Sequence, residues 1–152
     1  MEGYEDFNIV RLSETQIPLA LKLMEKVFTL EQNIPASYLP VKFFPQMSWG
    51  AFHEEELIAL AVAWWEGDIW HWGRYAVEPN WRGKGIGKKL AHISMSELFD
   101  SGAKEVHIDA RDITVNLLSK MGARVIGESF DFFGNVSPMR LSIQDFRAMN
   151  LT

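Results

Sequence analysis

The chain has 152 residues, of which 47% are apolar and 23% charged, and its formal net charge at pH 7 is -5. This length suits a single domain over residues 1–152, and the apolar fraction is enough to bury a core. The negative charge argues against nucleic acid and anionic membranes as partners, because both require a basic protein surface.

Cysteine is absent, which excludes disulfides, thiolate metal sites and a cysteine nucleophile. The N-terminal stretch MEGYEDFNIV is acidic and has no apolar signal core. The longest apolar run, LIALAVAWW at 57–65, is too short to cross a bilayer. We therefore expect a soluble protein of the cytoplasm that has no membrane partner.

The first third of the chain predicts a strand, a helix and a loop. FNIVRL at 7–12 has the composition of a short strand. Apolar residues then recur at helical spacing over 14–30. The N-cap is either Ser13, with Gln16 as its capping-box partner, or Thr15, which would place Pro18 better in the first turn. The stretch 34–46 contains three prolines and several aromatic residues, so we expect a loop that either lines a pocket or caps the core.

The middle of the chain predicts three consecutive antiparallel strands over 47–79, with turns near HEEE at 53–56 and EGD at 66–68. Glycines then open a helix over about 85–101, which Ser101-Gly102 closes. Alternating residues over 104–110 predict a further strand.

The last third predicts a short helix over 113–121, capped by Asp112 and ended by Gly122. Its inward-facing residues are expected to be Ile113, Leu117 and Met121. Two final strands, ARVIGESF at 123–130 and SPMRLSI at 137–143, complete a mixed α/β sheet.

Glycines at 83, 85 and 87 lie between a predicted strand and a predicted helix. Without Cβ atoms, such a backbone can approach an anion closely, and the helix N-terminus adds the positive end of its dipole. Arg82, Lys84 and Lys88 can add charge. The alternative is a plain flexible turn, but the regular placement of the glycines favours a site for a small polyanion.

Two common phosphate loops do not match. A Walker A loop needs four residues between its first glycine and Gly-Lys, whereas Gly83 and Gly87 enclose three, and Lys89 stands where a hydroxyl residue would bind magnesium. A dinucleotide loop needs a third glycine where this chain has Lys88.

The pattern Arg82-x-x-Gly85-x-Gly87, preceded by AVEP at 76–79, resembles the pyrophosphate loop of the GNAT family of N-acetyltransferases. The resemblance covers most of the chain, and DARDITVNLLSKMGARVIG at 109–127 is similar to the closing motif of that family. It implies a single-domain, layered α+β fold of the α/β class. Its central sheet would be mixed but mostly antiparallel, flanked by helices, with a splay between the fourth and fifth strands.

The resemblance implies acetyl-CoA or another acyl-CoA as the donor and no metal. The backbone from 83 to 88 would hold the diphosphate, and residues 75–77 would pair with the pantetheine arm as an added strand. The N–H of Val77 would polarise the thioester carbonyl. The expected donor-binding residues are Tyr75, Ala76, Val77, Arg82, Gly83, Lys84, Gly85, Ile86, Gly87 and Lys88.

His71 lies six residues before Val77, where some branches of the family carry a general base. Simple alternation places both on one face of the strand, and an imidazole can take a proton from an amine near neutral pH. The alternatives are that His71 is a packed strand residue, or that the base is Glu78. His107 and Asp109 are further candidates. The histidines show no i, i+4 pairing, so we expect no zinc site.

Six tryptophans occur in the chain, and five of them cluster around the predicted 69–81 region. They either form an aromatic pocket for the acceptor amine or serve the core and a subunit interface, such as that of a homodimer. The core and interface interpretation is favoured, because both faces of the strand carry indoles.

The family commonly carries an aromatic pair whose tyrosine protonates the departing CoA thiolate, but Leu117 and Leu118 stand at those positions. A thiol with a pKa of about 8.5 scarcely needs an acid at neutral pH, so water, Tyr75, Asn116 or Ser119 can do this work. We expect an acyl-CoA-dependent N-acyltransferase that passes acetyl directly to a primary amine of a small molecule or peptide. The alternative is a CoA-binding or sensing module with little catalysis.

Overall fold

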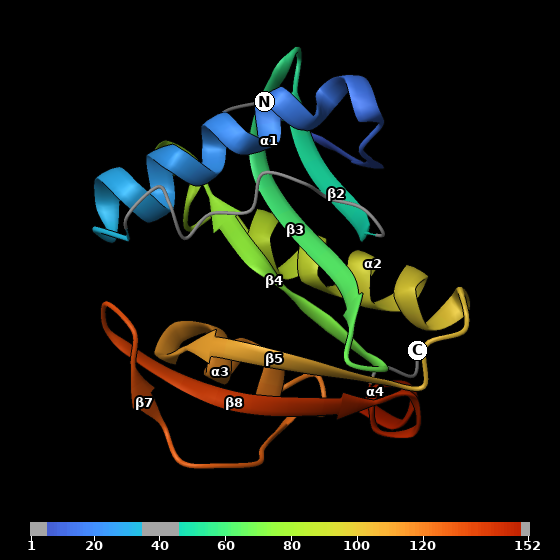
Figure 1. Cartoon of the computed structure of the whole chain (residues 1–152). Helices are drawn as coiled ribbons and strands as arrows, with labels where there is room; N and C mark the ends of the chain where they lie inside the picture. The colour runs from blue at the N-terminus through green and yellow to red at the C-terminus, as the bar shows by residue number, and fades with distance from the viewer. Residues whose placement is uncertain (1–5, 35–45, 150–152) are drawn as a thin grey trace. The chain divides into compact units, whose positions relative to one another are not determined.

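The computed structural model describes residues 6–34 and 46–149 (Figure 1). Its strands are β1 (Asn8–Arg11), β2 (Gln46–His53), β3 (Glu56–Glu66), β4 (Ile69–Val77), β5 (Glu105–Arg111), β6 (Arg124–Val125), β7 (Phe130–Asp131) and β8 (Asn135–Ser142). Its helices are α1 (Ile17–Met24), α2 (Ile86–Asp100), α3 (Asp112–Ser119) and α4 (Ile143–Met149), with short helical segments η1 (Glu14–Gln16), η2 (Glu25–Glu31) and η4 (Pro79–Trp81).

Hydrogen bonds join the described strands in the order β1-β2-β3-β4-β5-β8-β6, with β7 beside β8. The sheet is mixed, because β4 and β5 are parallel and the other registered pairs are antiparallel. The predicted fold class is therefore confirmed. Contacts divide the chain into two compact units, Met1–Val62 with Arg74–Ser94, and Ala63–Gly73 with Met95–Thr152.

In the first unit, β1 pairs with β2 from Asn8↔Phe52 to Arg11↔Trp49, which confirms the predicted first strand. The predicted helix over 14–30 is also confirmed, as one helical stretch from η1 through α1 into the π-helix η2. The Ser13 N–H donates to Gln16 Oε1 at 2.8 Å, as the predicted capping box requires. The buried face of this stretch is formed by Ala20, Leu23, Met24 and Val27. Most of the predicted loop over 34–46 lies outside the described residues.

The three strands predicted over 47–79 are confirmed as β2, β3 and β4. The turn between β3 and β4 has positive φ at both Gly67 and Asp68, 63° and 62°. Two consecutive left-handed residues make a type I′ turn, whose twist matches that of antiparallel strands. The hairpin predicted at EGD is therefore confirmed.

In the second unit, the ladder between β4 and β5 comprises Trp70↔Val106 and His71↔His107. By contrast, β5 and β8 lie side by side through seven registered pairs, from Glu105↔Ser142 to Arg111↔Val136 (Figure 1). A parallel ladder this short is consistent with the predicted splay between the fourth and fifth strands.

The C-terminal prediction needs two corrections. The strand predicted over 123–130 is two separate two-residue strands, β6 and β7, each paired with β8. A last helix, α4, follows β8 and was not predicted. Its start is fixed by the Asp145 N–H, which donates to Ser142 Oγ at 3.0 Å, and Phe146 is buried with its ring 5.3 Å from that of Phe99. Ser142 followed by Asp145 is a capping signal that sequence analysis could have used.

The inward face predicted for α3 is partly wrong. Ile113 is 81% exposed, while Thr114 and Leu118 are buried one turn apart, with Met121 buried just beyond the helix. Asp112 is the first residue of α3 instead of its cap, and its Oδ1 accepts from Asn135 Nδ2 at 2.9 Å. The observed buried face is thus offset from the predicted Ile113 and Leu117 by one residue, which is about 100° around the helix.

Leu118→Ala should lower the free energy of unfolding by about 2–5 kcal/mol, because the side chain is fully buried and its loss leaves a cavity. Ile113→Ala on the same helix is the matched control and should change it by less than about 0.5 kcal/mol. Urea unfolding of the three proteins measures both. Equal effects would show that the buried face of α3 has been assigned wrongly.

Candidate functional site

The glycine loop follows β4 and enters α2. Gly83 and Gly85 have φ values of +79° and +81°, the left-handed region that suits glycine, and a Cβ on either would meet nothing within 4 Å. Alternating left-handed glycines turn successive N–H groups toward one side, which is the geometry of an anion-binding concavity. Both glycines are therefore required by the left-handed backbone conformation, and the loop around them is open.

The start of α2 supplies further donors. The Lys89 N–H donates to the Gly85 carbonyl at 3.2 Å, so Gly85 accepts the first helical bond. The N–H groups of residues 86–88 consequently have no acceptor within the helix. Ile86 is buried and anchors this end of α2 in the core of the first unit. The helix thus presents its positive end from a fixed position.

Gly87 allows β4 and α2 to lie close together. A Cβ at Gly87 would overlap the Tyr75 hydroxyl and would stand 3.2 Å from Val77 Cγ2. The Tyr75 ring is mostly buried, and this burial raises the pKa of its hydroxyl far above the ordinary value of 10.0. Tyr75 therefore keeps its proton at neutral pH, and its hydroxyl can donate or accept a hydrogen bond.

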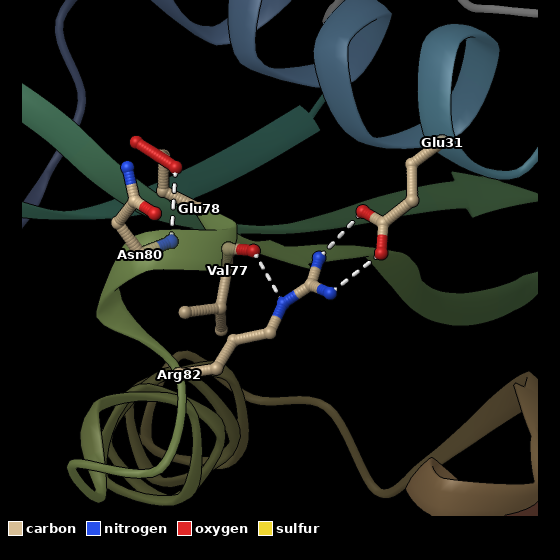
Figure 2. Close-up of polar contacts among 5 residues, drawn as sticks. All are labelled: Glu31, Val77, Glu78, Asn80 and Arg82. Atoms are coloured by element: carbon tan, nitrogen blue, oxygen red, sulfur yellow. Dashed lines mark hydrogen bonds and ion pairs between the residues drawn. The ribbon is translucent and has the colours of Figure 1, made fainter.

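Arg82 is the first residue of the predicted motif, and its side chain is held by two partners (Figure 2). Nε donates to the Val77 carbonyl oxygen at 3.0 Å, while Nη1 and Nη2 donate to the two carboxylate oxygens of Glu31 at 2.6 and 2.7 Å. This pairing raises the pKa of Arg82 and lowers the pKa of Glu31, mainly through the hydrogen bonds and then through charge. Glu31 was not among the predicted site residues, and no local signal connects it with Arg82.

Glu78 is buried at the end of β4 and has two partners of its own. Its Oε1 accepts from the Asn80 N–H at 3.1 Å, which caps the turn η4, and its Oε2 lies 3.3 Å from Lys26 Nζ. Figure 2 shows the Glu78 carboxylate turned back toward Asn80, while Arg82 points toward Glu31. The structure therefore gives Glu78 a capping role beside its candidacy as a base.

Lys84 and Lys88 are exposed on the loop and at the start of α2. The Lys84 ammonium lies 5.9 Å from the centre of the Trp81 ring, and that ring lies 4.7 Å from His53. Trp81 thus makes a cation–π contact with the Lys84 ammonium, which keeps this positive charge at the loop.

His71 belongs to the second unit. Its Nε2 lies 3.2 Å from the Glu66 carbonyl oxygen, and its ring stacks on Trp64 with centroids 5.5 Å apart and planes 11° apart. A carbonyl oxygen can only accept, so the neutral imidazole carries its proton on Nε2 and its lone pair on Nδ1. Gly73 leaves space for the Trp64 indole, because a Cβ there would lie 3.3 Å from Trp64 Cη2.

His107 pairs in register with His71, and their ring centroids are 6.3 Å apart. The Nε2 atom of His107 lies 2.9 Å from Glu105 Oε2, a bond that fixes its own tautomer. Asp109, the other candidate on β5, is exposed. These groups make a half-buried imidazole pair with one carboxylate at its edge.

The alternation used to place His71 and Val77 on one face does not run regularly along β4. Arg74, which lies between them, has a φ of 47°, a left-handed conformation that is uncommon for a residue with a Cβ. The assignment of both residues to one face therefore stays a prediction.

The tryptophans have different environments. Trp72 and Trp49 are buried core residues, which agrees with the favoured interpretation, whereas Trp65 is 45% exposed and meets Trp70 edge-on at 5.7 Å. Among residues 6–34 and 46–149, no group of three or more His, Asp or Glu side chains is arranged to hold a metal ion. The helices of that same part of the chain include none long and apolar enough to cross a membrane.

The chain belongs to the acetyltransferase (GNAT) family, which it matches over residues 19–123. This finding confirms the resemblance seen in the sequence. A search of curated proteins gives no match.

Solved structures share the fold at low sequence identity. ElaA from Escherichia coli is 21% identical with a TM-score of 0.79, over 90% of this chain and 99% of that one. FeeM, an N-acyl amino acid synthase from uncultured soil microbes, is 11% identical with a TM-score of 0.78, over 99% and 97% of the two chains. PaiA N-acetyltransferase from Thermoplasma acidophilum, solved with coenzyme A, is 15% identical with a TM-score of 0.66, over 90% and 99%. These structures establish a GNAT fold for this chain.

The Glu31–Arg82 pair should make stability depend on pH. Because the pKa of Glu31 is lowered from 4.5 on folding, the stabilisation is complete above that value and is lost as the pH falls through the lower folded value. Both side chains are about 40% exposed, 42% for Arg82 and 39% for Glu31, so the contribution is about 1 kcal/mol or less.

Urea unfolding of wild type and Glu31→Gln should therefore differ at neutral pH and converge as the pH falls below the lowered pKa of Glu31. Glu25→Gln, an exposed glutamate on the same helix, is the control. A difference between wild type and Glu31→Gln that persists unchanged in acid would contradict the pairing.

Proposed function

We propose that this protein transfers an acetyl group from acetyl-CoA directly to a primary amine of a small molecule or peptide. The observation that carries the proposal is the pair of left-handed glycines, Gly83 and Gly85, at the N-terminus of α2. A diphosphate needs several N–H donors and no metal, and this loop offers them on a preformed path. The family membership and the solved relative with bound coenzyme A support the same donor.

Residues 82–88 would hold the diphosphate of the donor through backbone N–H groups, with Lys84 and Lys88 adding charge. The pantetheine arm would pair with residues 75–77. The Glu78 N–H donates to the Ile58 carbonyl on β3 at 2.8 Å. Because successive peptide groups of a strand point to opposite edges, the N–H and C=O of Val77 point away from β3. This orientation suits an N–H that polarises a thioester carbonyl.

His71 would act as the general base through Nδ1, since Nε2 is held by the Glu66 carbonyl. The amine lone pair forms the new C–N bond at the thioester carbonyl, the C–S bond breaks, and the amine proton passes to the base. With no cysteine to carry the acyl group, transfer is direct. Glu78 is the alternative base, although proton uptake there would compete with its bonds to Asn80 and Lys26.

The departing thiolate would take its proton from water, because burial raises the pKa of the Tyr75 hydroxyl and makes it a weaker acid than the thiol. Leu118, which stands where the resemblance to the family implies a tyrosine, is fully buried in the core of the second unit. It has no proton to give, and its burial makes Leu118→Tyr a packing change as well as a chemical one. The lack of a proton donor at position 118 favours the second candidate function, an acyl-CoA-binding module with little turnover.

Gly85→Asp should weaken acetyl-CoA binding by roughly tenfold or more, because it sets a negative side chain against the diphosphate. Gly67→Asp is the matched control, since Gly67 is also left-handed, at φ +63°, and also has open space around it. Isothermal titration of acetyl-CoA into the folded variants measures the effect. Unchanged affinity in Gly85→Asp would refute the loop as the donor site.

His71→Ala should lower turnover by roughly 10²–10⁴ and leave acetyl-CoA affinity almost unchanged. His92→Ala, on the exposed face of α2, is the control. Release of free CoA thiol in the presence of amine, amino-acid, polyamine and peptide pools finds the acceptor and then measures the rate. Wild-type turnover in His71→Ala would move the role to Glu78 or to water. Tight acetyl-CoA binding without turnover on any pool would favour the binding module.

A further inference from the structure

Two ion pairs of opposite polarity connect the π-helix η2 with the segment that follows β4. Lys26 Nζ lies 3.3 Å from Glu78 Oε2, and the Glu31 carboxylate accepts both terminal nitrogens of Arg82. A cation and an anion on the helix thus face an anion and a cation on residues 78–82. Such alternation disfavours a shifted alignment, which would bring like charges together. The two pairs therefore fix the segment along η2.

All three nitrogens of the Arg82 guanidinium take part in this arrangement. Each of its three nitrogens donates a hydrogen bond, one to the Val77 carbonyl oxygen and two to Glu31 (Figure 2). The fork of a bidentate pair sets the plane of the group as well as its position. The side chain is consequently bound to the protein's own backbone and to η2.

The backbone group that Arg82 holds lies at the edge proposed for the donor. The N–H and C=O of one strand residue point to the same edge, and those of Val77 point away from β3. Arg82 Nε therefore donates to the carbonyl of Val77, the same residue whose N–H would polarise the thioester. Holding this carbonyl fixes the peptide that follows Val77, from which the chain turns into the glycine loop.

We infer that Glu31 and Arg82 form a brace in which Glu31 is a positioning residue for the acyl donor. Glu31 orients the Arg82 guanidinium, and Arg82 in turn fixes the Val77 backbone against which the pantetheine arm lies. In this role the Arg82 side chain is not a ligand of the diphosphate. The inference rests on the proposed binding of acetyl-CoA.

The Arg82→Lys variant separates the two roles of this side chain, a cation near the diphosphate and a planar hydrogen-bonding group in the brace. Arg82→Lys keeps the positive charge but cannot donate to Val77 and to both Glu31 oxygens at once. It should weaken acetyl-CoA binding about fivefold, as should Glu31→Gln, and the double variant should be no worse than either single one. Glu25→Gln is the control. Wild-type affinity in Arg82→Lys with a loss in Arg82→Ala would show a cation acting on the diphosphate and would overturn the brace.

A second ligand shows whether the loss of affinity arises at the pantetheine arm or at the diphosphate. The nucleotide half of CoA, 3′-phospho-ADP, carries the diphosphate but lacks the pantetheine arm. The brace predicts that Glu31→Gln and Arg82→Lys lose more affinity for acetyl-CoA than for 3′-phospho-ADP. Equal losses for both ligands would place the side chain on the diphosphate, and tighter binding in Glu31→Gln would mean that Glu31 withholds Arg82 from it. Either result overturns the inference.

Amide hydrogen exchange tests the brace without any ligand. The Glu78 and Trp81 amides donate to the Ile58 and Glu78 carbonyls at 2.8 Å each. Their exchange should speed up severalfold in Glu31→Gln and Arg82→Lys and stay unchanged in Glu25→Gln. Unchanged exchange in the first two variants overturns the brace even if acetyl-CoA binds. Wild-type protein that binds no acetyl-CoA would instead overturn the proposed function, whatever the exchange shows.

Discussion

The close approach of β4 to the start of α2 is the constraint on which the proposed donor site of this protein depends. Gly87 permits it, because a side chain there would collide with the Tyr75 hydroxyl and press on Val77. With Ile86 buried beside it, the first turn of the helix is fixed while residues 83–85 stay open. A phosphate loop needs this combination, since donors that must first be ordered by the ligand bind more weakly than donors already in place.

Polar contacts around the end of β4 extend this preorganisation. Glu78 caps the turn that follows the strand, and Arg82 returns to the Val77 carbonyl from the far side of the same turn. Both side chains reach η2, through Lys26 and Glu31. The connection formed by residues 78–82 is thereby held at both ends, which limits the conformations that the backbone can adopt on entering the loop. The exposed Arg82–Glu31 pair contributes little to stability, so its value here lies in geometry.

The second unit supplies a different kind of group. His71 is held between the Glu66 carbonyl and the Trp64 indole, which together set its tautomer and the plane of its ring. His107 is oriented in the same way by Glu105. A base is effective only when its lone pair is directed, so the tautomer is as much a part of the proposed mechanism as the choice of residue.

Local sequence determined most of the fold and the donor loop. The strands, α2, the type I′ turn at Gly67-Asp68 and the glycine motif at 83–87 all depend on near neighbours, so spacing and turn chemistry were enough to predict them. The two errors have different sources: the buried face of α3 is set by tertiary packing, which buries Thr114 and leaves Ile113 exposed, and the Ser142 cap of α4 was missed. Long-range geometry was decided by the tertiary structure alone. Glu31 meets Arg82 across 51 residues, and Arg74 takes a left-handed conformation within β4. Neither follows from local pattern, because each depends on how distant segments pack, and that packing decides which charged groups face each other.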